Sequence, residues 1–557
     1  MNENRKIAKR WRVISAALVF ASSGAIASAQ VINESQKWVP ADGATEDFFG
    51  YKVAASRTYS IVGAYKDDDS ATDAGSAYLY ETLTGLQLME IYASDGTWGD
   101  RFGSGVAINE TYAIVGARYA GDNGTESGGA YVFDVATGAE LFKLLPADGS
   151  ADEHFGSKLA ISGTTVVAGL SRDNDNGFYS GSAYLFDAST GFQIAKLLAS
   201  DGASSDYFGI SVAIDGNLVV VGAFRDDDNG TMSGSAYLFD ATTGAELAKL
   251  LPDDGDSNDE FGVSVGISGV TVIVGAEGDE LDGSNANSGS AYIFDVSNPQ
   301  APVQVHKLVP NDSSPATLFG SHVGISGQLA VVSRQFDNSS AVSGGSAYLF
   351  NTTTGAQIAK LLPSDPQNGD QFGGSVTISN GICVIGAPFD DDNGSDSGSV
   401  YLFEFEPGTP YCFGSAPGIP CPCGNPSSAH EGCSNSTGSG SRLDASGSRS
   451  ISLDYCTFIA DQLPPGPALY FQGNNAINEG QGAYFGDGLR CAGGSVIRLE
   501  VRFSSGGASQ TTISIPTKGG VSPGQTKRYQ LWYRDTNGSP CGSDFNLTNG
   551  YEITWAL

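Results

Sequence analysis

The sequence predicts an all-β protein: a seven-bladed β-propeller of four-stranded antiparallel blades, followed by a small disulfide-containing β-sandwich-like domain. Three observations support this fold class. The dipeptide Phe-Gly recurs seven times along the chain, each repeat holds four short strand-like runs, and cysteines gather only after the last repeat. Sheets repeated in this way bury their faces by stacking radially, which is the arrangement of a propeller.

The seven Phe-Gly pairs stand in phase and define the repeat. Consecutive pairs lie 53 residues apart except once, where a Pro-containing insertion near Pro299 lengthens the spacing to 58. Such regularity indicates a repeat architecture. The seven phenylalanines are Phe49, Phe102, Phe155, Phe208, Phe261, Phe319 and Phe372.

The unit from Phe208 to Leu251 illustrates the expected strands of one blade. Apolar or alternating runs at 211–214, 218–222, 235–239 and 246–251 are separated by Gly- and Asp-rich turns, as in antiparallel hairpins. The last repeat ends after its third strand, while residues 37–43 resemble a fourth strand with its following turn. We therefore expect residues 35–40 to pair with 400–403 and close the ring without an unpaired edge.

Each repeat carries Phe-Gly, then Gly-Ala or a variant fourteen residues later, then a run such as Gly-Ser-Ala-Tyr-Leu-Phe-Asp. This pattern resembles the FG-GAP repeat of integrin α-chain propellers and of many secreted bacterial proteins. The resemblance covers about residues 31–405 and implies a β-propeller in an extracellular setting. Blade 6 departs most from the pattern, with Val332-Ser333 in place of Gly.

The charge of the chain restricts its partners. The 557 residues contain 62 Asp and Glu against 29 Lys and Arg, a net charge of −33, and the acidic excess lies within residues 30–411. Such a surface repels phosphate backbones and anionic lipids, so we expect no nucleic-acid partner. Cations and extracellular protein or glycan ligands are the expected partners, and the protein is expected to be a monomer.

Residues 1–29 have the features of an export signal. Basic residues from Arg5 to Arg12 precede the apolar run Val13–Ala21, and Ala27-Ser28-Ala29 matches a cleavage pattern. No later stretch is apolar enough for a membrane helix. We therefore expect a secreted or cell-surface protein without a membrane span, cleaved near Ala29.

Aspartates that follow the Gly-Ala position are the candidate metal ligands. In integrin-type repeats a calcium loop precedes Gly-Ala-Pro, but here that interval is a short hairpin, so the family site does not carry over. Carboxylates two residues apart can surround a hard cation, which makes calcium the candidate cofactor, with a solvated turn as the alternative. The four pairs are Asp67 and Asp69, Asp173 and Asp175, Asp226 and Asp228, and Asp390 and Asp392.

A second set of acids precedes each phenylalanine. An Asp stands seven residues before it in all seven repeats, and an acid stands two residues before it in six. We interpret the Asp at minus seven as structural, because Asp-Gly turns bind their own backbone. Strand polarity places both sets of acidic loops on one face of the disc, which we expect to be negative.

The domain boundaries follow from composition: signal peptide 1–29, propeller 30–408, a Cys/Gly/Ser-rich connector 409–450 and a C-terminal module 451–557. Strands are expected near 468–471, 496–503, 511–515 and 528–533. The seven cysteines after residue 408 predict three disulfides and one remaining thiol, whereas Cys383 is expected to be a buried thiol. A zinc site at Cys421, Cys423, His430 and Cys433 is a minor alternative.

No catalytic or cofactor-binding residue stands out, since the four histidines lie at different phases of the repeat. The leading hypothesis is therefore a secreted or cell-surface, non-catalytic binding or adhesion protein that presents an acidic face, with calcium as a possible aid. A secreted polysaccharide-acting enzyme on a propeller scaffold is one alternative. An envelope structural protein without a specific ligand is the other.

Overall fold

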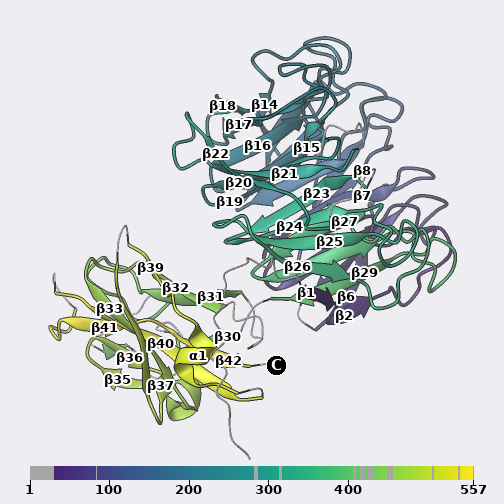
Figure 1. Cartoon of the computed structure of the whole chain (residues 1–557). Helices are drawn as coiled ribbons and strands as arrows, with labels where there is room; N and C mark the ends of the chain where they lie inside the picture. The colour runs from purple at the N-terminus through teal and green to yellow at the C-terminus, as the bar shows by residue number, and fades with distance from the viewer. Residues whose placement is uncertain are drawn as a thin grey trace, which may run out of the picture.

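The structure is a computed structural model, and its described residues are almost entirely β, with two short helical elements, η2 and α1, among them (Figure 1). It describes residues 30–555 except 83, 281–286, 313–316, 406–408, 414–420, 423–430, 448–450, 452–455, 505–506, 523 and 537–539. The expected signal peptide, residues 1–29, lies outside the described residues.

Seven sheets form the blades, and each blade has four strands that neighbour one another in the sheet. Blades 1 to 3 are β3 (Lys52–Ala55), β4 (Tyr59–Ala64), β5 (Ser76–Glu81) and β6 (Leu86–Ile91); β7 (Phe102–Ile108), β8 (Tyr112–Ala117), β9 (Gly129–Asp134) and β10 (Glu140–Leu144); and β11 (Lys158–Ser162), β12 (Thr165–Leu170), β13 (Ser182–Asp187) and β14 (Gln193–Leu197).

Blades 4 to 7 continue the same order along the chain. They are β15 (Ser211–Asp215), β16 (Leu218–Ala223), β17 (Ser235–Asp240) and β18 (Glu246–Leu250); β19 (Phe261–Ser268), β20 (Thr271–Ala276), β21 (Ser290–Asp295) and β22 (Val303–Leu308); β23 (Phe319–Ser326), β24 (Leu329–Arg334), β25 (Ser346–Asn351) and β26 (Gln357–Leu362); and β27 (Ser375–Ser379), β28 (Ile382–Ala387) and β29 (Ser399–Glu404). The seven predicted blades are thus confirmed.

The repeated motif holds neighbouring blades together. Phe208 is fully buried and packs edge-on against Tyr237 and Phe239, with ring centroids 5.4 and 5.8 Å apart. Gly209 has φ 89°, and a Cβ on Gly222 would lie 2.0 Å from the carbonyl oxygen of Gly262 in the next blade. The Gly of Gly-Ala in one blade therefore lies against the Phe-Gly glycine of the next, where only a residue without Cβ allows the close approach.

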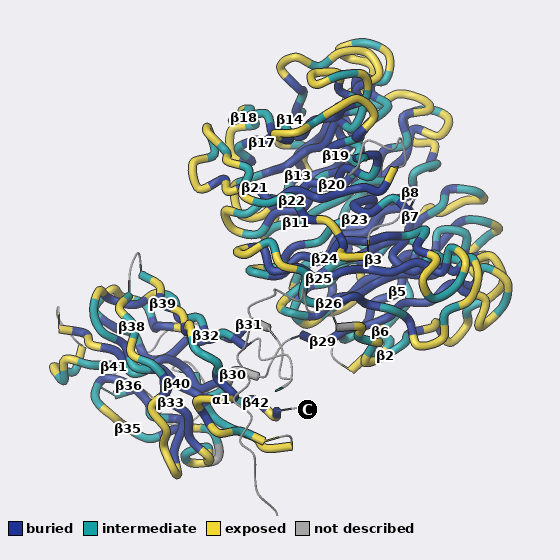
Figure 2. The backbone as a smooth tube through the Cα atoms, viewed as in Figure 1, coloured by how far each residue is buried: buried dark blue, intermediate teal, exposed yellow. Residues whose placement is uncertain are grey.

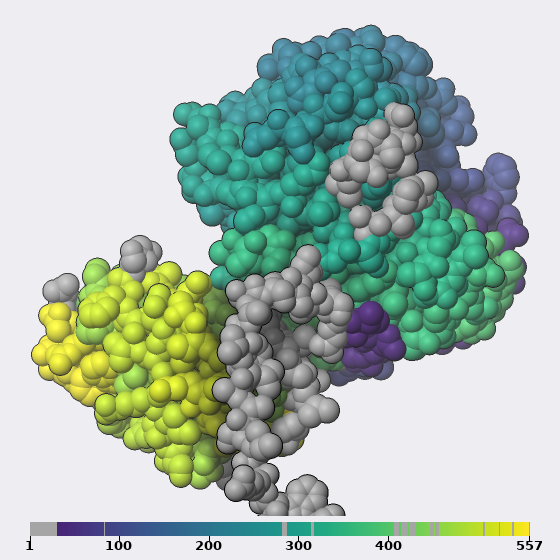
Figure 3. All heavy atoms as spheres, viewed as in Figure 1, coloured from purple at the N-terminus to yellow at the C-terminus, as the bar shows by residue number. Residues whose placement is uncertain are grey.

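The N-terminal segment closes the ring as predicted. Strand β2 (Gln36–Trp38) pairs antiparallel with β29, so that Lys37 lies opposite Tyr401, and it supplies the fourth strand of blade 7. Strand β1 (Gln30–Asn33) adds a fifth strand to blade 6 by pairing in parallel with β26, which the sequence analysis does not predict. In Figure 3 this N-terminal segment, in purple, lies against the green surface of the last blades.

The strands of the blades and the loops that connect them differ in burial. In Figure 2 the strands of the propeller are mostly buried, and the exposed residues concentrate in the loops at the ends of the strands. The innermost strands of all seven blades line a central channel, in which a cavity of about 520 Å³ runs past Lys52, Lys158 and His322.

The C-terminal module consists of two main sheets that share one core. The larger sheet has the order β30-β42-β40-β33-β38, with β41 paired to β40, and the smaller has the order β31-β32-β39. Phe458 and Leu443 from the smaller sheet pack with Tyr470, Leu531 and Trp555 around the larger one, as in a sandwich. The strands are β30 (Thr409–Tyr411), β31 (Arg442–Gly447), β32 (Cys456–Asp461), β33 (Pro467–Gly473), β34 (Asn475–Ala476), β35 (Ala483–Phe485), β36 (Gly488–Arg490), β37 (Ala492–Gly493), β38 (Ile497–Phe503), β39 (Ser509–Gln510), β40 (Thr526–Arg534), β41 (Phe545–Leu547) and β42 (Gly550–Thr554).

Two expectations for the module need revision. The run 511–515 is not a strand: it leads into helix α1 (Ile515–Gly519), because Ser514 caps the helix by accepting a bond from the Thr517 amide and Pro516 stands in the first turn. The second helical turn is η2 (Ile477–Gly480). Strands β30 and β31 lie within the range assigned to the connector, yet they pair with β42 and β32 of the module.

Cysteines of the module form disulfides, as predicted. Cys412 pairs with Cys491 and Cys421 with Cys433, and Cys541 belongs to a further disulfide. Because Cys421 and Cys433 are joined to each other, they offer no thiolates, and the zinc alternative is wrong. Cys383 is a buried thiol outside any disulfide, and burial raises its pKa.

Candidate functional site

The two sets of acidic loops meet at one end of each blade. In blade 4, the Tyr237 hydroxyl donates to Asp201, which stands seven residues before Phe208, at 2.8 Å and to Asp226 after Gly-Ala at 2.7 Å. Asp226 also accepts bonds from the Ser235 hydroxyl and the backbone amide of Asp228. The predicted structural role of the Asp at minus seven agrees with these contacts.

A lysine from the fourth strand supplies the positive charge among these carboxylates. Lys249 Nζ in β18 lies 2.8 Å from Asp201, 2.8 Å from Asp226 and 2.6 Å from Asp228. Burial of Asp226 raises its pKa, but the hydrogen bonds from Lys249, Tyr237 and Ser235 outweigh burial and hold that pKa below its usual value. We call this arrangement of acids around one position the carboxylate cage.

Six of the seven blades contain the same cage with a lysine in it. The structure brings Asp173 and Asp175 together around Lys196, and Asp390 and Asp392 around Lys37, as it does Asp226 and Asp228 around Lys249. The other occupied cages contain Lys143 with Asp95 and Asp122, Lys307 with Asp254 and Asp279, and Lys360 with Asp312 and Asp337.

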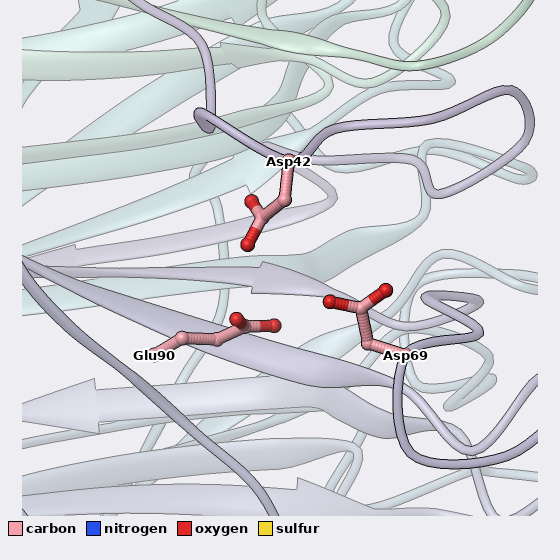
Figure 4. A group of neighbouring side chains, drawn as sticks. All are labelled: Asp42, Asp69 and Glu90. Atoms are coloured by element: carbon pink, nitrogen blue, oxygen red, sulfur yellow. The ribbon is translucent and has the colours of Figure 1, made fainter.

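Blade 1 is the exception, because Glu90 stands at the lysine position of its fourth strand. Carboxylate oxygens of Asp42, Asp69 and Glu90 all lie within 4.8 Å of one another, and Figure 4 shows these side chains converging from two loops and β6. Asp67 lies in the same cage, buried and bonded to the Ser76 and Tyr78 hydroxyls. Burial, together with the charges of Asp67 and Asp42, raises the pKa of Glu90 to about 7.

The surroundings of the aspartate pairs predicted to bind calcium therefore differ between blade 1 and the other blades. The pairs at 173/175, 226/228 and 390/392 surround a lysine ammonium, whereas the pair at 67/69 faces a further carboxylate. Calcium binding at any of these pairs stays a prediction. The sequence analysis missed the repeated lysine. It could have been found, because it stands at the same position of the repeat in a chain with few lysines.

Acids two residues before the phenylalanine, present in six of the seven repeats, stabilise the same loops from within. Asp206 is 8% exposed and accepts a bond from the Ala203 amide, while burial raises its pKa to about 6. Asp47, Asp259 and Asp370 are similarly buried, and burial raises the pKa of each to about 6. These carboxylates belong to the turn and do not reach the cage lysine within ion-pair distance among the described residues.

An arc of aromatic and arginine side chains surrounds part of the channel mouth, inside the ring of cages. Most of its members stand just before the repeat phenylalanine or just after Gly-Ala, while Tyr179 comes from later in the β12–β13 loop, and these positions differ from blade to blade. Contacts along it run from Phe48 and Tyr65 (5.3 Å) through Arg101 over Tyr119 (4.6 Å), Tyr119 and His154 (4.6 Å), and Tyr179 and Tyr207 (5.6 Å), to Arg225 over Tyr207 (5.1 Å).

Because of the arc, the face that was expected to be acidic is not uniformly negative. Acidic loops form the rim, where lysines neutralise part of their charge, and Arg101, Arg118, Arg172 and Arg225 lie among half-buried aromatic rings nearer the channel. Sequence reasoning missed this arc because its members come from separate blades and match no motif.

The C-terminal module has a separate apolar pocket of about 430 Å³. Phe471, Phe485 and Trp532 line it together with Arg490 and Arg498. Tyr533, the neighbour of Trp532, is 1% exposed and belongs to the core. Alternation along β40 therefore places Tyr533 in the core and Trp532 at the pocket.

Comparison with known proteins agrees with the blade geometry. No helix among the described residues is long and apolar enough to cross a membrane. No curated protein matches the chain. The sequence model of the FG-GAP repeat matches seven times, at residues 32–80, 86–133, 139–186, 192–239, 245–294, 302–350 and 356–403. These matches cover more than half of the chain and coincide with the blades, so the protein belongs to the FG-GAP repeat family.

Proposed function

We propose that this protein is a secreted or cell-surface, non-catalytic binding or adhesion protein that holds an extracellular protein or glycan on the propeller face around the channel mouth. The observation that carries the proposal is the arc of aromatic and arginine residues. Tyr and Arg are enriched in the cores of protein interfaces, and aromatic rings also stack on sugars. Here they project from a rigid ring of blades, which holds them in place for binding.

The distribution of sequence differences supports a binding role. Core and turn positions are near-copies in all blades and the cage lysine recurs in six, whereas the arc positions vary from Phe48 and Arg101 to His154 and Tyr207. A repeat scaffold that varies at one surface has the organisation of a binding face. The export signal expected at 1–29 and the disulfides of the C-terminal module fit an oxidising, extracellular location.

Calcium enters this proposal at blade 1. In the other blades a lysine already balances the cage, but four carboxylates of blade 1 gather with no lysine beside them among the residues that the structure describes: Asp42, Asp67, Asp69 and Glu90. Calcium is the divalent ion that accepts irregular sets of carboxylate oxygens most readily. We infer that calcium takes the place of the missing lysine and holds the loops of blade 1 beside Phe48 and Tyr65.

The binding proposal is tested on a glycan array and in a cell-adhesion assay. Tyr207→Ser should reduce binding by about tenfold, because an interface aromatic commonly contributes more than 1 kcal/mol. The matched control is Phe192→Ser, a 75% exposed aromatic in the β13–β14 turn at the opposite end of the blade, which should bind normally. Equal binding by both variants contradicts the proposal, and turnover of a glycan by the protein would favour the polysaccharide-acting enzyme instead. Absence of any binding would favour the structural alternative.

The calcium proposal is tested separately by calorimetry and thermal unfolding. Calcium should raise the Tm of the wild-type protein more than magnesium does. Glu90→Lys should remove this difference and raise the Tm in the absence of calcium, because it installs the lysine of the other blades. Asp152→Lys, an exposed change of the same charge on the same face, should keep the calcium response. A calcium response that survives Glu90→Lys would refute the blade 1 site.

A further inference from the structure

A small pocket opens beside the channel, where the first strands of blades 1 to 3 begin. It has a volume of about 190 Å³, which is roughly six water volumes. Its wall contains Lys52, Arg118, Lys158 and Arg172, together with His154. The pocket therefore gathers five basic residues in a chain whose net charge is −33.

The two lysines and two arginines of this pocket differ from the cage lysines in their partners. Within the described part of the chain, none of them lies within ion-pair distance of a carboxylate, although each cage lysine contacts two or three. The nearest polar contact of Lys52 Nζ is His322 Nε2 at 3.3 Å. Arg118 reaches the Tyr51 hydroxyl at 3.4 Å, and its Nε is buried without a hydrogen-bond partner among those residues.

The remaining charged groups around the pocket leave this excess uncompensated. The Glu153 carboxylate accepts the Ser150 amide, and its pKa is raised by burial. Glu277 faces Lys158 from across the channel. Its pKa is raised to about 7, mainly by burial and to a lesser extent by repulsion from Glu260. His154 lies between Arg172 at 3.3 Å and Glu126 at 3.2 Å, at the outer edge.

Burial, together with repulsion among the cations, lowers the proton affinity of these groups. Burial, assisted by Arg118, lowers the pKa of Lys52 to about 8, and burial with the charge of Lys52 lowers the pKa of Lys158 to about 8. Burial and both lysines hold the pKa of His322 well below its usual value, so its ring is neutral at pH 7. An anion among these groups would relieve the repulsion and raise both lysine pKa values.

We propose that this pocket binds an oxyanion group, a sulfate, phosphate or carboxylate, between Lys52 and Lys158 with Arg118 and Arg172 as further donors. Guanidinium groups present paired N–H donors that match the oxygens of such groups, and the Ser157 and Ser171 hydroxyls stand in the same wall. The inference adds ligand chemistry to the proposed binding face. It rests on the proposed function only for the biological use of the site.

The test is calorimetric titration of the purified protein with inorganic phosphate, sulfate and acetate in separate arms at pH 7 and constant ionic strength. We expect saturable binding at one site, with the three anions competing. Lys52→Met combined with Lys158→Met should weaken binding at least about tenfold, since each lysine contributes a charged hydrogen bond. Lys518→Met, at an exposed lysine of α1, is the matched control and should bind normally. Absence of saturable binding, or full affinity in the double variant, would overturn the proposal.

A second measurement on the unaltered chain covers the case in which the double variant fails to fold. At pH 8, a small acylating reagent should modify Lys52 and Lys158, because about half of each is neutral there, and phosphate or sulfate should protect both lysines but not Lys518. Protection supports the site, and unchanged labelling contradicts it. Loss of oxyanion binding would leave the Tyr207→Ser adhesion result standing, so the two proposals fail independently.

Discussion

At the residue scale, one ammonium group determines whether a cluster of acids is stable. Lys249 lies among three carboxylates, of which Asp226 is almost fully buried while Asp201 and Asp228 are about half exposed. Clustered carboxylates repel one another unless a cation balances them, and burial strengthens that repulsion. In blade 1 the repulsion is not balanced in this way. Glu90 adds a negative charge at the position where Lys249 of blade 4 supplies a positive one.

Replacing Lys249 should therefore destabilise the protein, because the three carboxylates of the cage would repel one another. Lys249→Met is expected to lower the free energy of unfolding by about 2 kcal/mol, a value reduced from that of a fully buried pair because two of the acids face solvent. Urea denaturation with Lys518→Met as control measures this loss. The variant should also gain a calcium-dependent rise in Tm, since Asp201, Asp226 and Asp228 already lie within 4.8 Å of one another. An unchanged stability would mean that solvent alone screens the cage.

At the element scale, the short strand β2 has more influence than its three residues suggest. It completes blade 7, supplies Lys37 to the last cage, and places Trp38 across the seam onto Tyr80 of blade 1. The two rings stack at 4.9 Å with an interplanar angle of 10°, and Trp38 is 4% exposed. The seam is thus held by backbone pairing, an ion cluster and an aromatic stack together.

Trp38→Ala should weaken the whole ring. The loss of a buried aromatic side chain commonly costs about 3–5 kcal/mol, and here it also opens the seam. Trp98→Ala is the control, because Trp98 is 73% exposed and should change stability little. Differential scanning calorimetry compares the two variants, and equal melting temperatures would show that the seam does not limit stability. Deletion of residues 30–42 should lower the Tm markedly for the same reason.

The elements that sequence could predict are those determined by local pattern. Strand runs, turns and ring closure follow from alternation and from the offset of the repeat, as the pairing of Lys37 with Tyr401 illustrates. The contact between Lys249 and Asp201 joins a fourth strand to a loop that precedes the first, so periodicity alone does not place them together. The arc is harder still, because Tyr119 and His154 meet only through the curvature of the ring. In the module, α1 escaped prediction because Ser514 and Pro516 override a β-branched run.

At the scale of the whole molecule, the buried acids make stability depend on pH. Burial raises the pKa of Asp47, Asp206, Asp259 and Asp370 to about 6, above the unfolded value of 3.8. The folded state therefore binds more protons than the unfolded state between these values, and stability falls as the pH rises through this window. Cage acids act in the opposite direction only at lower pH, since Lys360 and Ser346 outweigh burial and lower the pKa of Asp337 to about 2.

We expect the protein to be more stable at pH 5 than at pH 7, by about 1 kcal/mol for each of the four buried acids. Below about pH 4 the stability should fall again, as the cage carboxylates accept protons. Chemical denaturation across pH 4–8 tests the profile. Asp206→Asn keeps an acceptor for the Ala203 amide and should remove one share of the change between pH 7 and pH 5. A profile that rises steadily from pH 5 to pH 7 contradicts this assignment.

The pairing of β2 with β29 also has a consequence for biosynthesis. The strand that completes the last blade leaves the ribosome before all the other blade strands, and its partner near Tyr401 follows more than 360 residues later. At typical synthesis rates the first strand waits on the order of tens of seconds for that partner. Until then the growing chain cannot complete its circle, and blade 7 lacks its fourth strand. Ring closure is therefore expected only after the last repeat has been synthesised.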